Sequence, residues 1–210
     1  MTFRPEETVR TRARLREIIP EQDSVRVLQK DLDRLNRVAR DFIALSPFLV
    51  LATSGRRGRV SVSPRGDRPG FVEVHDDRTL LIPDRLGNQR LDCFENILDD
   101  PRVGLIFLVP GHPETLRISG TAAIVRDSAA QARLAHGGRE PALILAVRAE
   151  QVFMHCAKAF LRSRLWQAET WPARRTAPSL AQWVSEAVPS ELTEAEIQEI
   201  HDEDAATRLY

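Results

Sequence analysis

A series of short β-type segments between residues 48 and 155 is the feature that most constrains the fold. Residues 115–124 show the clearest pattern, because apolar and polar side chains alternate and give the segment one core face and one polar face. Residues 48–53 form a continuous apolar run that is too short for a helix and ends at Ser54 and Gly55. Together with the short Gly- and Pro-containing turns, these segments predict about six antiparallel strands in a small closed or split barrel.

Helical spacing occurs before, within and after this region. Apolar residues recur every three or four positions as far as Leu45, and Asp23 or Ser24 could cap this helix. Residues 87–98 and 128–135 also have helical spacing. We therefore expect a mainly β protein with flanking helices, of the α+β class.

The change of pattern along the chain predicts three parts. Residues 1–47 form an N-terminal helical segment, residues 48–156 form the barrel, and residues 157–210 form a C-terminal helical extension. The extension carries all 3 tryptophans of the chain, and large aromatic side chains favour burial. We expect the extension to pack on the barrel or on a partner subunit.

Composition excludes several classes of partner and site. Lys+Arg and Asp+Glu balance at 30 each, so there is no basic surplus for nucleic acid or an anionic membrane. No apolar run is long enough to span a bilayer, and the N-terminus has no apolar signal region. Cys93 and Cys156 form no C-x-x-C pair, and the spacing of His75, His112 and His155 predicts no metal site. We expect a reduced, cytoplasmic protein with a small-molecule partner.

Candidate phosphate-binding groups gather where the β-type segments end. Arg65 follows one such segment, and Arg85, Asn88 and Arg90 lie in or beside the loop that opens the helical segment 87–98. Guanidinium groups and the unpaired N–H groups of a helix N-terminus both bind phosphate. Each residue alone could be an ordinary surface arginine or turn asparagine, but their grouping favours an anion site.

Ser61 and Ser63 alternate with Val60 and Val62, which we interpret as core residues. The serine hydroxyls could donate hydrogen bonds to the same phosphate. The alternative is that they form the polar outer face of a strand.

Seven motifs occur in the order found in a known family. They are residues 63–67, 69–72, 82–90, 96–97, 100–105, 116–120 and 155–159. Together they resemble the pyridoxamine 5'-phosphate oxidase-related, FMN-binding split-barrel proteins, in an uncharacterised bacterial branch. The resemblance extends to Leu209 and Tyr210, and it implies a dimeric split β-barrel that binds FMN at the subunit interface.

The resemblance also implies roles for individual residues. The FMN phosphate would lie against the strand 60–65 and the loop 87–90, and the backbone of Ile82 and Pro83 would lie near the flavin ring. Arg117 would lie near the ring as well, although a cross-strand ion pair is the rival account. Lys158 would complete the site from one subunit or the other. The implied FMN-binding set is Ser61, Ser63, Arg65, Ile82, Pro83, Arg85, Asn88, Gln89, Arg90, Arg117 and Lys158.

Two departures separate this chain from the true oxidases of the family. Gln89 and Arg90 stand where those oxidases carry an Arg-Lys pair, and their substrate-binding C-terminal segment has no match here. We therefore expect an FMN-dependent oxidoreductase acting on another, unidentified small molecule. The alternatives are a non-catalytic flavin-binding or sequestering protein, and a split-barrel binder of haem or a deazaflavin. No catalytic residue is assigned, because His155 and Cys156 are more often structural.

Overall fold

The structure is a computed structural model that describes residues 2–21, 24, 29–87, 89–173, 176–189 and 191–208. The chain divides into two compact units, residues 1–31 and residues 32–210. The first unit contains helix α1 (Arg12–Ile18), which is capped by the side chain of Thr11 and has no buried side chain. The candidate site lies in the second unit.

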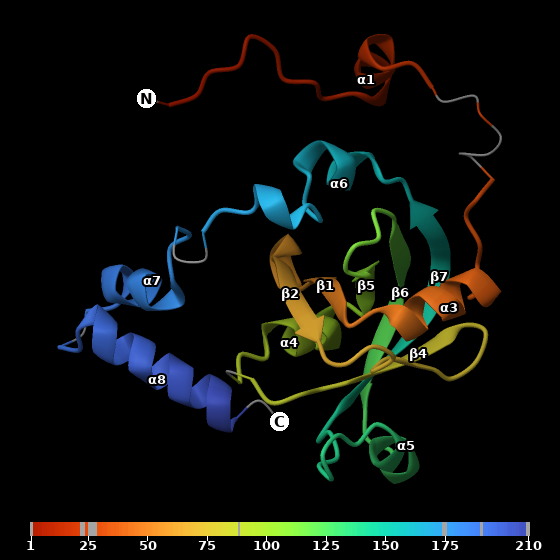
Figure 1. Cartoon of the computed structure of the whole chain (residues 1–210). Helices are drawn as coiled ribbons and strands as arrows, with labels where there is room; N and C mark the ends of the chain where they lie inside the picture. The colour runs from red at the N-terminus through yellow and green to blue at the C-terminus, as the bar shows by residue number, and fades with distance from the viewer. Residues whose placement is uncertain are drawn as a thin grey trace. The chain divides into compact units, whose positions relative to one another are not determined.

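The second unit is built on an antiparallel sheet whose described strands follow the order β2-β1-β5-β6-β7-β4-β3 (Figure 1). The strands are β1 (Phe48–Ser54), β2 (Val60–Gly66), β3 (Glu73–Val74), β4 (Thr79–Pro83), β5 (Arg102–Leu108), β6 (Thr115–Val125) and β7 (Ile144–His155). Every neighbouring pair of described strands is antiparallel. The prediction of a mainly β protein with flanking helices is confirmed.

Helix α3 (Arg37–Leu45) starts later than the sequence pattern predicts. Its N-cap is Asn36, whose side chain accepts a hydrogen bond from the Ala39 N–H at 2.9 Å. A continuous helix from Asp23 or Ser24 is wrong, because Leu32 forms an antiparallel bridge with Val152 of β7. Residues 22, 23 and 25–28 lie outside the described residues.

Helix α4 (Asp92–Asp99) begins after Leu91 rather than at Gly87. Gln89 has a φ of 56°, in the left-handed region that does not continue an α-helix. Asp92 and Glu95 occupy the first turn of α4, and their charges complement the positive end of the helix dipole. The predicted helix start is therefore wrong, and carboxylates of α4 itself lie at its N-terminus.

The main hydrophobic core lies between one face of the sheet and these two helices. Leu49 of β1, Phe107 of β5 and Val147 of β7 are all 0% exposed, and Ile43 of α3 and Ile97 of α4 belong to the same cluster. Helix α4 contacts β1, β2 and β6, and α3 contacts β6 and β7. Full burial of one such side chain stabilises the fold by about 1.5–3 kcal/mol.

In strand β2, the side chains that face the interior are the serines and not the valines, contrary to the prediction. Val60 and Val62 are each 66% exposed, whereas Ser61 and Ser63 are half-buried. The prediction of core valines is therefore wrong. The reason is that β2 ends the described sheet order, and its inner side faces the polar Asn96 of α4 rather than an apolar layer.

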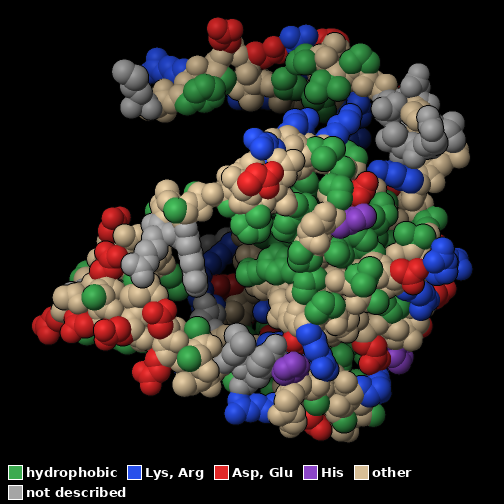
Figure 2. Space-filling model, viewed as in Figure 1, with side chains coloured by type: hydrophobic (Ala, Val, Ile, Leu, Met, Phe, Trp, Pro, Cys, Tyr) green, Lys and Arg blue, Asp and Glu red, His purple; other side chains and the backbone are tan. Residues whose placement is uncertain are grey.

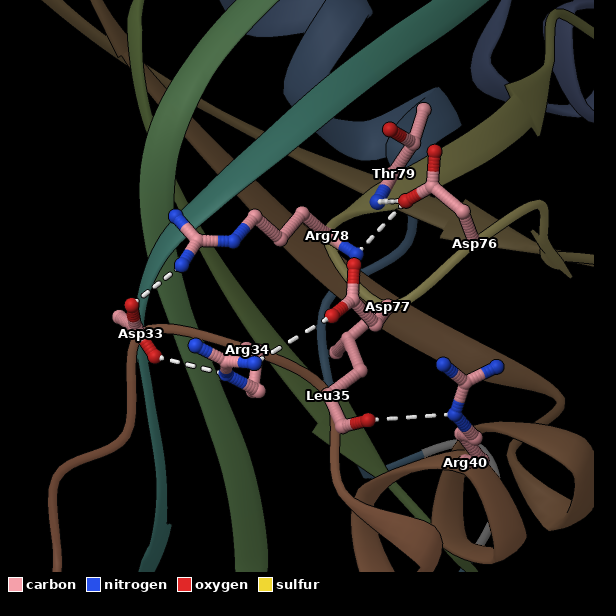
Figure 3. A network of polar contacts seen from close by, with 8 residues as sticks. All are labelled: Asp33, Arg34, Leu35, Arg40, Asp76, Asp77, Arg78 and Thr79. Carbon is pink, nitrogen blue, oxygen red and sulfur yellow. Dashed lines mark hydrogen bonds and ion pairs between the residues drawn. The ribbon is translucent and has the colours of Figure 1, made fainter.

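The segment before α3 is joined to the turn between β3 and β4 by a polar network (Figure 3). The Asp76 carboxylate accepts hydrogen bonds from the backbone N–H groups of Arg78 and Thr79, both at 2.7 Å. The Leu35 N–H donates to the Asp77 carbonyl at 2.7 Å, and the exposed Asp33 pairs with Arg78. Exposed ion pairs contribute little, so the backbone hydrogen bonds make the main contribution here.

Among the described residues, a short η1 (Arg56–Gly58) joins β1 to β2, and α5 (Ser128–Arg133) follows β6. The described helices after β7 are α6 (Lys158–Ser163), η2 (Ala168–Thr170), α7 (Leu180–Ala187) and α8 (Glu194–Thr207). Helices α7 and α8 contact each other. After α6, the Trp166 indole donates to the His112 carbonyl at 2.9 Å and stacks on Phe160. None of the described helices has the length and apolar character needed to cross a membrane.

Replacing Gly120 with alanine tests the strand pairing. Gly120 lies where the register between β6 and β7 shifts, and a Cβ atom there would lie 1.9 Å from the Arg148 carbonyl oxygen. Because backbone would have to move, we expect Gly120→Ala to lower the free energy of unfolding by about 3 kcal/mol or more in urea titrations.

Gly104→Ala is the matched control, because its Cβ would lie 3.9 Å from the Ala52 side chain, an ordinary contact. We expect Gly104→Ala to change the free energy of unfolding by less than about 1 kcal/mol. Equal losses in the two variants would contradict this account of the β6–β7 pairing.

Candidate functional site

Two cavities open beside β2 and the loop before α4, and the walls of both include Arg65 and Arg90. The smaller cavity has a volume of about 370 Å³ and is lined by residues 59–65 together with Arg90, Asp92 and Cys93. The larger has a volume of about 580 Å³ and is lined by Arg65, residues 84–87 and 89–91, Phe94, His136 and residues 139–142. The shared arginines make the two cavities neighbours.

The smaller cavity is rich in hydrogen-bond donors. Its lining residues include Arg59, Arg65 and Arg90, which carry guanidinium groups, and Ser61 and Ser63, which carry hydroxyls. Charge-assisted hydrogen bonds from guanidinium groups to an oxyanion are about twice as strong as neutral ones. This donor set has the chemistry of a phosphate or carboxylate site.

Asp92 is the acidic side chain of the smaller cavity, and it lies near two of these arginines. The Arg90 Nε donates to Asp92 Oδ2 at 3.0 Å, and the Arg59 Nη2 lies 3.7 Å from Asp92 Oδ1. The Arg90 side chain is nevertheless 69% exposed, so it can turn toward a ligand. A bound anion would share these arginines with Asp92.

The larger cavity combines an apolar wall with charged groups. Phe94 is 6% exposed and lies beneath the Arg65 guanidinium, whose carbon is 5.5 Å from the ring centroid. Leu86 and Pro141 extend the apolar wall, and Arg139 adds a further cation. Apolar walls with a few convergent polar groups are typical of small-molecule sites.

Asp84 is a titratable group in the wall of the larger cavity. Burial raises the pKa of the Asp84 carboxyl above its usual range, while the positive charge of Arg65 acts in the opposite direction. The Arg65 Nη1 lies 3.8 Å from Asp84 Oδ1. A half-buried carboxyl with a perturbed pKa in a cavity is a candidate functional group.

Arg85 supports the wall of the larger cavity through its own hydrogen bonds. Its Nε donates to the fully buried Asp67 carboxylate at 2.7 Å, and its Nη1 donates to the Leu134 carbonyl at 2.9 Å. His136 Nδ1 lies 3.8 Å from the same carboxylate. These contacts join the loop after β4 to the segment after α5.

The predicted site residues fall into four groups, of which Arg117 and Lys158 form the last. Ser61, Ser63, Arg65, Arg85, Gln89 and Arg90 line one or both cavities. Ile82 and Pro83 are buried in β4, where they pair with β7 and precede Asp84. Asn88 lies outside the described residues.

Arg117 and Lys158 line neither cavity. Arg117 is exposed on β6, with its guanidinium carbon 5.2 Å from the centroid of the Phe153 ring. Lys158 is the first residue of α6 and is exposed. Within one chain, the structure therefore does not bring these two residues to the other predicted site residues.

Sequence reasoning missed Arg59, His136 and Arg139, which line the cavities. Arg59 directly precedes β2, and its position before a strand with alternating serines was the available signal. His136 and Arg139 form an isolated antiparallel bridge after α5. Strands β3, β4, β5 and β6 separate this segment from β2 in sequence, so no local pattern could have placed the two residues at the site.

Comparison with known proteins identifies the family. The family model described as pyridoxamine 5'-phosphate oxidase matches residues 35–156. A search of curated proteins gives no match.

Solved structures with a similar chain include three bacterial proteins. A putative pyridoxamine 5'-phosphate oxidase from Lactobacillus delbrueckii is 24% identical, with 58% of this chain and 95% of that chain covered and a TM-score of 0.46. An FMN-binding protein from Syntrophomonas wolfei is 13% identical, with coverages of 56% and 84% and a TM-score of 0.46. The haem storage protein HutZ from Vibrio cholerae is 14% identical, with coverages of 58% and 94% and a TM-score of 0.40.

The family match covers α3, all the strands and α4, and it includes the linings of both cavities. It agrees with the resemblance carried by the seven sequence motifs. The chain belongs to the pyridoxamine 5'-phosphate oxidase family.

Proposed function

We propose that this protein is an FMN-binding flavoprotein that acts as an oxidoreductase on a small molecule. The observation that carries the proposal is the smaller cavity, where Arg59, Arg65, Arg90, Ser61 and Ser63 converge. A phosphate group carries up to two negative charges and strong acceptor oxygens, which this donor set matches. When bound, FMN supplies the hydride and electron transfer chemistry, and the protein supplies binding, orientation and electrostatics.

The larger cavity suits the ring end of the cofactor and a substrate beside it. Its volume of about 580 Å³ is within the range of about 300–1,000 Å³ that is usual for ligand sites. Arg65, whose guanidinium lies over the Phe94 ring, lines both cavities. Asp84 could exchange a proton with a substrate there, because its pKa is raised by burial.

An exposed apolar face of the sheet supports a homodimer of split β-barrels. Figure 2 shows hydrophobic side chains gathered over β2, β1, β5 and β6. Val60 and Val62 are each 66% exposed, and Ile106 is 37% exposed. Arg117 pairs in register with Ile106, so it lies on this face. Association of two copies through this face would carry Arg117 toward the site of the partner subunit.

FMN affinity tests the phosphate site. We expect Arg65→Ala and Arg90→Ala each to weaken FMN binding about tenfold or more, because each removes a charged hydrogen-bond donor. Riboflavin lacks the phosphate, so its affinity should fall less than about threefold. Fluorescence titration of both ligands gives the comparison.

Arg102→Ala is the matched control for these variants, because Arg102 is 79% exposed and pairs with Asp100, away from both cavities. It should leave FMN affinity unchanged. Equal losses for FMN and riboflavin, or no FMN binding by the unaltered protein, would contradict the assignment. A Soret band on adding haem would instead favour a haem-binding function.

Reoxidation kinetics separate an enzyme from a flavin-sequestering protein. We expect the FMN-loaded protein, once photoreduced, to be reoxidised about tenfold faster with 1,4-naphthoquinone-2-sulfonate than in buffer, because the larger cavity admits a planar anion beside Arg139. Arg139→Ala should raise the quinone concentration needed for the half-maximal rate by a larger factor than it weakens FMN binding. Slow reoxidation that does not depend on the quinone would support a non-catalytic protein.

The dimer is tested by a charge on the exposed sheet face. Val62→Asp should convert the dimer to a monomer in analytical ultracentrifugation, because an unpaired carboxylate would be buried between the two copies. Leu98→Asp is the control, since Leu98 is 77% exposed on α4. A monomeric unaltered protein, or a Val62→Asp variant that stays dimeric, would contradict the proposed interface.

A further inference from the structure

A buried amide lies directly behind the smaller cavity. Asn96 of α4 is 8% exposed, and its Nδ2 donates to Ser61 Oγ and to Thr53 Oγ1, each at 3.0 Å. A side-chain amide has two N–H donors, so both are used. Asn96 therefore connects the outer strand β2 to β1 through two hydroxyl oxygens.

Gly55 leaves room for this amide, whose orientation follows from the two hydrogen bonds that its nitrogen donates. A Cβ atom at Gly55 would lie 2.2 Å from Asn96 Oδ1 and 2.9 Å from its Cγ. The amide oxygen thus occupies space that any larger residue at position 55 would take. With the oxygen beside Gly55, the nitrogen faces Thr53 and Ser61, and both hydroxyl oxygens act as acceptors.

The hydrogen of the Ser61 hydroxyl must therefore point away from Asn96. A serine hydroxyl has one O–H donor, and here its oxygen already accepts from the amide. Ser61 lines the smaller cavity, whereas Thr53 is 3% exposed and lines neither cavity. Of the two hydroxyls, Ser61 is the one that can donate to a ligand.

We propose that Asn96 is a positioning residue that makes the Ser61 hydroxyl a hydrogen-bond donor to the phosphate bound in the smaller cavity. This inference rests on the proposed FMN site and adds a residue that does not touch the ligand. A donor oriented before binding loses no rotational freedom on binding, so the contact strengthens phosphate affinity more than a freely rotating hydroxyl would. The contribution applies to FMN and not to riboflavin.

Asn96→Asp tests the orientation with little change in shape. The new carboxylate has no donor, so it accepts from Ser61 and Thr53 and turns the Ser61 hydrogen away from the cavity. We expect FMN affinity to fall about tenfold and riboflavin affinity less than about twofold, with an altered 31P chemical shift of bound FMN. Gly55→Ala displaces the same amide without adding charge, and it should lower the ratio of FMN to riboflavin affinity in the same direction.

Ser61→Ala separates this role from simple charge repulsion. In a Ser61→Ala background, Asn96→Asp should lower FMN affinity by less than about threefold, because the hydroxyl through which it acts is gone. Thr53→Val is the control that removes the other partner of Asn96, and it should leave the ratio of FMN to riboflavin affinity unchanged.

Three results would overturn the proposal. The first is that Asn96→Asp weakens FMN binding as much in the Ser61→Ala background as in the unaltered protein. The second is that Asn96→Asp weakens FMN and riboflavin binding equally. The third is that neither Asn96→Asp nor Gly55→Ala changes FMN affinity. An unaltered protein that binds FMN no more tightly than riboflavin would instead remove the phosphate site itself, and the role of Asn96 with it.

Discussion

The burial of one apolar face of the antiparallel sheet is the constraint on which the rest of the structure depends. Helices α3 and α4 cover that face and contribute to a single large cluster of buried side chains. Because α4 packs against β1 and β2, the loop before it comes beside the inner side of β2. The apolar core thereby brings Arg90 next to Ser61 and Arg65, which are distant in sequence.

Ion pairs between arginine and aspartate side chains also shape the walls of the cavities. The pairs are Arg65 with Asp84, Arg85 with Asp67 and Arg90 with Asp92. A charge that is partly removed from water costs free energy unless it has a partner. The Arg85–Asp67 pair is the most buried and supports the cavity wall, whereas Arg90 is mostly exposed. Arginine therefore supports the cavity wall at position 85 and remains largely in solvent at position 90, where we propose that it contacts the ligand.

Local patterns predicted much of the fold. The alternation in residues 115–124 corresponds to β6, and the short helical segment after it corresponds to α5. The helix starts were less predictable. Gln89 adopts a left-handed conformation that no spacing rule indicates, and it moves the start of α4 to Asp92. Leu32 pairs with β7, although its spacing suits a helix.

Local patterns also predicted part of the candidate site, but not the residues that come from a distant segment. Ser61, Ser63, Arg65, Gln89 and Arg90 were expected together, and the structure places all five in the cavity walls. His136 and Arg139 joined them only because β6 and β7 carry the segment between them to the larger cavity. Alternation showed that the two serines share one side of β2 but not which side is inward.

By itself, the sequence determined the strand periodicity, the family and the residue types of the proposed phosphate site, because these depend on neighbouring residues or on motif order. The tertiary structure alone decided that the serines of β2 face inward, that Asn96 contacts Ser61, and that Arg117 lies on an exposed face. Those features depend on packing between distant segments, and the physical reason is that burial is a property of the assembled layers rather than of any one strand.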